Sequence, residues 1–219
     1  ALPILNSISI GSNLFIRDDV KLKDVDLVGA KVGAQLEIMK TSITGRLGMD
    51  SISVGSHLLI GEGSEFQDLI LIVARIGGDL DIKSSRFAGT VNMESIFVDK
   101  SVFLCADKFE DRVYLIDADV SGNVVISYAE ISFLDLSGTH IRGKLQVGSP
   151  KAKPNWTQNS VLYLRNTQVG TLEDKHETSW PEKLDMDGFT YSRLSGLSDQ
   201  GTDPGGDRKS TRLNSSHRT

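Results

Sequence analysis

The sequence predicts an all-β fold: a right-handed parallel β-helix, built as a four-sided solenoid. Three observations predict it. Apolar residues recur every 22 residues, each 22-residue unit divides into two similar 11-residue halves, and the apolar residues of each half are paired two positions apart. A spacing of two is the period of a β-strand, and it points both side chains of a pair to the same face. The chain is therefore expected to wind as short strands joined by corners.

The repeat is visible when the sequence is written in rows of 22 residues that start at Val25, Leu47, Leu69, Val91 and Val113. The columns headed by Val25, Leu27, Ala30, Val32, Leu36 and Ile38 are apolar in each of these rows. Only 39% of the chain is hydrophobic, so random placement does not give such columns. We expect the columns to point inward and to be buried by the stacking of neighbouring coils.

Glycines follow the apolar pairs and mark the corners between strands. They are Gly33, Gly45, Gly55, Gly77, Gly89, Gly122 and Gly143. We expect them to supply the positive φ that a corner needs, since glycine adopts it without steric cost. Parallel crossovers favour the right hand. Leu22 and Phe66 each lie one residue later than the repeat requires, which predicts a bulge at two corners.

The repeat divides the chain into five parts. We predict a regular β-helix over 1–147, a looped-out insertion over 148–161, final β-helical coils over 162–193 with a loop at 171–183, and a linker over 194–206. Larger aromatic residues near the end suit a last coil that caps the core. Residues 207–217 resemble a translated sequencing adapter, so we predict a non-native tail over 207–219 and expect the native termini to be missing.

Charge limits the choice of partner. The chain has 24 basic and 29 acidic residues, a net charge of −5. Without the four basic residues and one acidic residue of 207–219, the body has 20 basic and 28 acidic residues, a net charge of −8. Binding to nucleic-acid phosphates needs lysine and arginine, so we expect no nucleic-acid partner. The longest apolar runs are too short for a membrane-spanning helix.

No motif for catalysis, a cofactor or a metal stands out, and we predict none of these sites. The single cysteine, Cys105, excludes paired-cysteine chemistry within the chain. The histidines are not spaced as zinc ligands, and no dinucleotide-binding glycine motif opens a helix. The segment Gly138–Lys144 resembles a phosphate-binding loop, but the next residue is Leu145 rather than serine or threonine, and no helix is expected after it.

Some apolar residues occupy outward positions of the repeat and form the candidate interaction surface. They are Leu59, Ile70, Ile72, Phe103, Tyr114, Ile116 and Val125. Stacked columns would bring them into apolar stripes, which are typical of contacts with a partner or a membrane. Asp81 and Asn92 interrupt these stripes, so scattered surface hydrophobes, which are common, are the alternative interpretation.

Two features resemble known families. The Ala-x-Val cores with four-faced spacing resemble the pentapeptide-repeat superfamily. The segment Trp180–Leu194 resembles the W-P-x-x-L-x-L-x-G-F-x-Y-x-R-L segment of a bacterial group often labelled "membrane-associated oxidoreductase" or hypothetical protein. The resemblance covers about residues 1–197. It implies a location in the bacterial cytoplasm, with a tether to the inner membrane through a C-terminal region that this sequence lacks, and it transfers no catalytic residue.

The first functional hypothesis is a non-enzymatic β-helical scaffold or interaction module of a bacterial, membrane-associated protein. Its expected partner is an unidentified protein or a membrane surface, with a homo-oligomer as a further option. The second hypothesis is a part of an oxidoreductase whose cofactor site lies outside this chain. The third is an acidic binder that mimics nucleic acid, which the net charge permits although the carboxylates form no ordered stripe.

Overall fold

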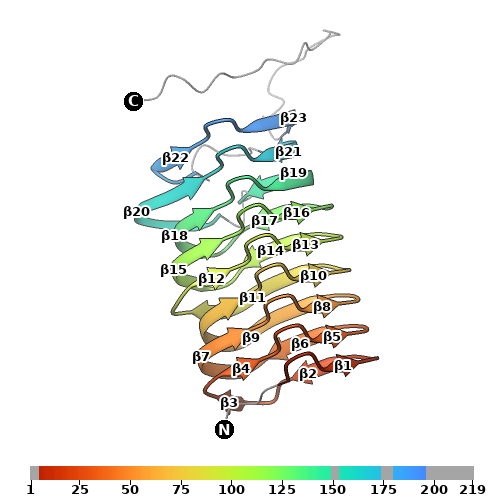
Figure 1. Cartoon of the computed structure of the whole chain (residues 1–219). Helices are drawn as coiled ribbons and strands as arrows, with labels where there is room; N and C mark the ends of the chain where they lie inside the picture. Colours follow the sequence, from red (N-terminus) through yellow and green to blue (C-terminus); the bar gives the residue numbers. More distant parts are fainter. Residues whose placement is uncertain (1–4, 149–152, 174–179, 196–219) are drawn as a thin grey trace.

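The chain forms a parallel β-solenoid of about 8 turns, with coils about 22 residues apart. A computed structural model describes residues 5–148, 153–173 and 180–195. Its coils climb from β1 at one end to β23 at the other (Figure 1), and the described residues contain no helix. The all-β solenoid predicted from the repeat is confirmed.

The strands are short and almost all run in register with the next coil. The lower coils contain β1 (Ser9–Ile10), β2 (Leu14–Ile16), β3 (Val20–Leu22), β4 (Val25–Asp26), β5 (Lys31–Val32), β6 (Leu36–Met39), β7 (Thr41–Gly48), β8 (Ser53–Val54), β9 (Leu58–Ile70), β10 (Arg75–Ile76) and β11 (Leu80–Phe87). The upper coils contain β12 (Val91–Asn92), β13 (Phe97–Val98), β14 (Val102–Cys105), β15 (Lys108–Tyr114), β16 (Asp119–Val120), β17 (Val124–Ile126), β18 (Glu130–Asp135), β19 (His140–Val147), β20 (Asn155–Tyr163), β21 (Gln168–Glu173), β22 (Lys183–Asp185) and β23 (Thr190–Ser195).

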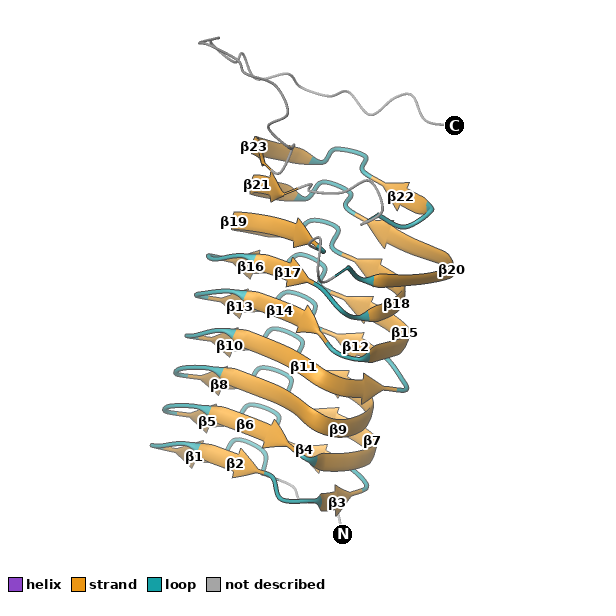
Figure 2. Ribbon diagram, turned by 180° about the vertical axis from the view of Figure 1, so that it is seen from behind, coloured by secondary structure: helices purple, strands orange, loops and turns teal. Residues whose placement is uncertain are grey.

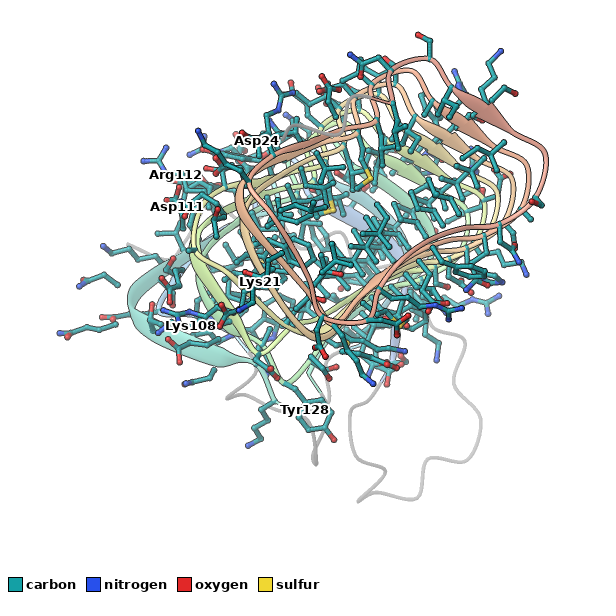
Figure 3. All side chains as sticks on the ribbon, turned by 90° about the horizontal axis from the view of Figure 1, so that it is seen from below. Lys21, Asp24, Lys108, Asp111, Arg112 and Tyr128 are labelled. Atoms are coloured by element: carbon teal, nitrogen blue, oxygen red, sulfur yellow. The ribbon has the colours of Figure 1, made fainter. Side chains whose placement is uncertain are left out.

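Four walls of stacked strands enclose the core, and each is defined by its parallel pairing. Val25 pairs with Leu47 on the first wall, and Val32 with Val54 on the second. Leu36 pairs with Leu58 on the third wall. Ile43 pairs with Phe66 on the fourth. The walls are seen from opposite sides in Figures 1 and 2, and side chains fill the space between them when the solenoid is viewed along its axis (Figure 3).

All six predicted core columns are buried. Every member of these columns in the five aligned rows is at most 2% exposed. The fourth wall adds a seventh column, in which Phe87 lies between Phe66 and Phe109 with ring centroids 5.0 and 5.3 Å apart. The rings are nearly parallel, since the interplanar angles are 16° and 15°. Stacked coils thus impose one side-chain position on residues far apart in the sequence.

The corner glycines do not have the role expected from the sequence. None of the seven predicted corner glycines has a positive φ. They are required by close approach instead: a Cβ on Gly55 would lie 2.3 Å from the carbonyl oxygen of Gly33 in the coil below. Glycine is used at these corners because the backbones of successive coils pass too close for a side chain.

Left-handed residues form a separate column at the corner between the first and second walls. Ser51, Val73, Ser95 and Asp117 occupy this corner in successive coils, with φ between 52° and 58°. At several of these corners a turn closes the chain: the N–H groups of Ala30, Ile52 and Ala74 donate to the carbonyl three residues earlier, at 3.0, 3.2 and 3.1 Å. The backbone conformation is fixed by the coil, and most side chains here tolerate it poorly.

Both predicted bulges are present. Ile16 pairs with Ile38 but Val20 pairs with Thr41, so the first coil has one extra residue between these positions. Similarly, Gly61 pairs with Lys83 and Ser64 with Ser85. Each extra residue is absorbed at a corner, after which the chain returns to register.

The insertion expected at 148–161 is shorter than predicted, because its second half is strand. β20 begins at Asn155, and Trp156 pairs with Ile131 on the fourth wall, where its partly buried ring packs on the core. An apolar residue in that column extends the wall. The loop expected at 171–183 begins only after Glu173, where β21 ends. Positions 174–179 of that loop, the linker beyond Ser195 and the tail at 207–219 lie outside the described residues.

The stacked phenylalanines give a first prediction. We expect Phe87→Ala to lower the free energy of unfolding by about 3–5 kcal/mol, because it removes a fully buried ring and leaves a cavity between two others. Phe97→Ala removes a ring that is 38% exposed and should cost much less. Urea unfolding followed by circular dichroism measures both; equal losses would contradict the role given to the stack.

The left-handed corner gives a second prediction. Val73 is a β-branched residue held at a φ of 58° with its side chain 44% exposed. We expect Val73→Asn to raise the free energy of unfolding by about 1 kcal/mol, because asparagine tolerates the left-handed conformation. Val125→Asn is the matched control on an extended strand, where losing a β-branched residue should destabilise. Thermal and urea unfolding compare the two, and a destabilised Val73→Asn variant would refute the explanation.

Candidate interaction surface

The seven residues of the candidate surface are all partly exposed and lie on, or directly beside, two different walls. Ile70 and Tyr114 belong to the first wall, and Ile72 and Ile116 lie two residues later, in the turn that follows it. The other three belong to the third wall: Leu59, Phe103 and Val125. The second wall lies between these sets along the chain. The structure therefore divides the candidate residues into two patches.

Polar residues interrupt both patches where the sequence predicts it. Asn92 pairs between Ile70 and Tyr114 on the first wall. Asp81 pairs between Leu59 and Phe103 on the third wall. Phe103 and Val125 are direct neighbours. Neither set by itself makes a continuous apolar stripe.

The first wall carries a continuous aromatic cluster that includes one predicted residue. The ring of Phe133 lies 5.6 Å from that of Tyr114, at an interplanar angle of 64°. Its other neighbour, Tyr163, also lies 5.6 Å away, at 69°. These edge-to-face rings come from β15, β18 and β20, three strands stacked in successive coils. We call Tyr114, Phe133 and Tyr163 the aromatic ladder.

Two arginines flank the aromatic ladder. The guanidinium of Arg112 lies 5.3 Å from the centre of the Phe133 ring and donates a hydrogen bond to the Tyr114 hydroxyl at 3.2 Å. The guanidinium of Arg165 lies 4.4 Å from the centre of the Tyr163 ring. Each arrangement is a cation–π contact, which holds a flexible arginine against a rigid ring. Figure 3 shows Arg112 projecting outward beside Asp111.

Asp185 anchors one of the two arginines. Arg165 donates to the Asp185 carboxylate at 2.7 Å. The pKa of the Asp185 carboxyl is lowered, first because the Asp187 N–H donates to it and then because Arg165 does. The carboxylate therefore stays ionised at neutral pH and keeps Arg165 in place. Arg112 has no ion-pair partner within the described residues, so its charge is available to a ligand.

Sequence reasoning missed Phe133, Tyr163 and both arginines. The upper coils differ in length from 22 residues, so rows of fixed length do not align Leu134 with Val113 or with Leu162. A usable signal exists: Phe133 precedes the buried Leu134, and Tyr163 follows the buried Leu162. A residue adjacent to an inward one on a strand points outward. Aligning on the leucines would have found the aromatic ladder.

The single cysteine, Cys105, is held in an unreactive setting. The Cys105 sulfur lies 3.1 Å from the Ser127 hydroxyl, and burial is the main cause that raises the pKa of its thiol. The thiol is thus protonated at neutral pH, and the thiolate is the reactive form. Within the described ranges, no three histidine, cysteine, aspartate or glutamate side chains gather as a metal site.

The segment that resembles a phosphate-binding loop is a strand. β19 begins at His140, and Ile141 and Leu145 point into the core. A shallow hollow lies beside it, lined by residues of β19, β21 and β23 that include His140, Gln168 and Thr190. Arg142, at its edge, is engaged by Asp119 at 2.7 Å. A phosphate-binding loop needs backbone N–H groups that converge before a helix, and this strand does not provide them.

No helix in the part of the chain that the structure describes is long and apolar enough to cross a membrane. Comparison of the sequence with protein-family models and with curated proteins, and of the fold with solved structures, finds no match.

Proposed function

We propose that this chain is a non-enzymatic scaffold that binds a partner protein through the first wall. The binding surface consists of the aromatic ladder with Arg112 and Arg165. The interlocked ring and arginine contacts on three stacked strands carry the proposal. Tyrosine and arginine are enriched among the residues that contribute most to protein–protein binding.

The surface is pre-organised, which favours binding. Each ring of the aromatic ladder is braced by a neighbour, and its strand is fixed on both sides by parallel pairing. Ordering side chains on association costs about 0.5–1.5 kcal/mol for each mobile side chain. Rings and guanidinium groups that are already ordered avoid most of this cost.

The shape of the surface favours a protein over a small molecule. Sites for small molecules are concave and enclose most of their ligand. The aromatic ladder instead runs along the outside of a wall, with neighbouring ring centroids 5.6 Å apart. Ile116, two residues after Tyr114, adds a partly exposed apolar side chain in the turn that follows this wall. A partner segment laid along this wall would meet several coils at once.

The charges indicate which partner fits. Arg165 is already engaged by Asp185, whereas Arg112 lies near Asp111 but forms no ion pair within the described residues. Arginine binds carboxylates through two parallel hydrogen bonds. We therefore infer a partner segment with apolar or aromatic side chains and one carboxylate placed near Arg112.

Mimicry of nucleic acid gains less support. A mimic needs rows of carboxylates that are free to face a basic partner. Here Glu130 forms an ion pair with Lys108 at 2.8 Å, and Asp119 forms one with Arg142 at 2.7 Å. Each pair joins two neighbouring coils. Glu110 is similarly bound by Arg86 at 2.7 Å. These three carboxylates join neighbouring coils and are not free to face a basic partner.

The third prediction tests the surface by peptide display. A random peptide library selected on the immobilised chain should enrich sequences that combine aromatic or aliphatic residues with aspartate or glutamate. Affinity of an enriched peptide, measured by fluorescence anisotropy, should fall at least about tenfold in Tyr163→Ala and in Arg112→Glu, the size of effect typical of central interface residues.

The second wall offers a matched control. Arg75 lies 4.3 Å over the ring of Phe97 and repeats the arginine–aromatic chemistry away from the aromatic ladder. Phe97→Ala and Arg75→Glu should change the affinity less than about twofold. Equal losses of peptide affinity in the variants of the aromatic ladder and in those of the second wall would show that any exposed arginine–aromatic pair binds such peptides. The proposal would be refuted if the library enriched no peptide on the wild-type chain. It would also be refuted if the enriched peptides bound the Tyr163→Ala variant as tightly as the wild type.

A further inference from the structure

The outward face of the first wall alternates between apolar and polar residues from coil to coil. Ile70 pairs with Asn92, and Asn92 pairs with Tyr114 in the following coil. Tyr114 then pairs with Asp135, and Asp135 pairs with Tyr163. This outward column is therefore apolar or aromatic at every second coil. Asn92, which separates the apolar residues in the sequence, is one member of a regular alternation.

The turn that follows this wall repeats the alternation in its lower coils. Ile72 and Ile116 lie in this turn two residues after the apolar members of the column, and both are partly exposed. Glu94 lies in the coil between them, since the N–H of Val73 donates to the carbonyl of Glu94 and the N–H of Ser95 donates to that of Ile116. Apolar side chains thus recur at every second coil in two adjacent columns.

The polar members of the column are bonded to their own backbone. The Asn92 side-chain oxygen accepts a hydrogen bond from the N–H of Glu94 at 2.9 Å. The Asp135 carboxylate likewise accepts from the N–H of Ser137 at 2.9 Å. Each bond is an Asx turn, in which a short side chain caps the backbone two residues further on. The longer side chains of the alternate coils therefore supply the contact points of this face.

The spacing of these contact points matches one peptide conformation. Neighbouring strands lie about 4.8 Å apart, so contacts at every second coil recur about every 9.6 Å along the solenoid axis. A polyproline II helix repeats every three residues, or about 9.3 Å. Two turns of an α-helix span about 10.8 Å, and side chains on one face of an extended strand recur about every 6.6 Å. From Ile70 to Tyr163, polyproline II drifts by about 0.6 Å and an α-helix by about 2.4 Å.

The hydrogen-bonding groups of the first wall fit the same conformation. The Tyr114 hydroxyl accepts from Arg112 at 3.2 Å, so its own proton is free to donate to a ligand. Tyr163 supplies a second hydroxyl two coils further along the wall. A polyproline II backbone has no internal hydrogen bonds, and proline has no N–H. The wall therefore offers donors to a backbone that presents mainly acceptors.

We propose that the partner segment is proline-rich and lies along the solenoid axis in the polyproline II conformation. Residues three positions apart in the segment contact Ile70, Tyr114 and Tyr163 in turn. A carboxylate beside the central contact residue pairs with Arg112, which forms no ion pair within the described residues. Because polyproline II is formed before binding, little ordering cost is added. This inference rests on the proposed function and adds Ile70 to the binding surface.

Two synthetic heptapeptides of identical composition test the spacing on the full chain. The first has proline at its first, fourth and seventh positions, aspartate at its fifth and alanine elsewhere. The second has proline at its first, third and fifth positions and aspartate at its fourth, so its prolines do not share one face. Fluorescence anisotropy of labelled peptides should show that the first binds at least about tenfold more tightly.

Peptide length tests the direction of binding. A tetrapeptide with proline at its first and fourth positions and aspartate between them reaches only two contact points, such as Tyr114 and Tyr163. Ile70→Asp should therefore weaken binding of the first heptapeptide at least about tenfold and change that of the tetrapeptide less than about twofold. Leu59→Asp is the matched control, a partly exposed aliphatic residue on the third wall, and should affect neither peptide. Circular dichroism checks that both variants are folded.

The outcomes separate this inference from the proposed function. Equal affinities of the two heptapeptides would overturn the three-residue spacing, and an Ile70→Asp variant that binds the first heptapeptide normally would overturn the direction. If library peptides bind in a way that depends on Tyr163 but neither heptapeptide binds, the polyproline II inference fails and the proposed function stands. If the library and the heptapeptides all fail to bind, both are refuted.

Discussion

Hydrogen bonding between successive coils is the constraint on which the rest of the structure depends. Each strand pairs in parallel with the strand one coil away, so a residue's position in the solenoid is set by its counterpart in the coil below. Strands are about 4.8 Å apart in a sheet. At that distance a single unsuitable side chain in a column disturbs both neighbours. This explains why the six core columns are apolar in all five aligned rows and why the ring of Phe87 lies between two rings of its own kind.

The same constraint organises the outer surface. Outward side chains are stacked as strictly as inward ones, which turns isolated residues into rows. Tyr114 and Tyr163 both pair in register with Asp135, and the ring of Phe133, two residues before Asp135, contacts both tyrosine rings from the strand between them. The acidic and basic side chains use the stacking too, as in the pair of Lys108 and Glu130. A surface of this kind gains its rigidity from the core beneath it, without a loop or a helix to position the binding groups.

Much of the fold could be predicted from the sequence, because burial acts directly on residue type. The apolar columns headed by Val25 and Leu36 can be recognised directly in the sequence, and both columns are buried in the structure. The corners could not be read in the same way. Close backbone approach and left-handed φ both favour glycine, but the chain places Val73 in a left-handed position and puts Gly55, which has no positive φ, where two backbones nearly touch.

The candidate site was harder to predict, for a physical reason. Outward residues are chosen for what they contact in solution, so they carry no repeat of their own and must be located from the core. Once coil length changes after Val113, that reference is lost. Tyr114 was identified because it lies within the regular rows. Its two ring partners, Phe133 and Tyr163, fall after the change and become visible only through the pairing of β15, β18 and β20.

A column of polar side chains at the corner between the second and third walls shows that the solenoid has a direction. The Asp79 carboxylate accepts from the N–H of Ser101 at 2.9 Å. The Ser101 hydroxyl accepts from Asn123 at 3.1 Å, and the Asn123 side chain accepts from Lys144 at 2.8 Å. Residue types differ, but each side chain is an acceptor for the coil that follows. Because the three bonds have the same sense, this column gives the solenoid a direction along its axis.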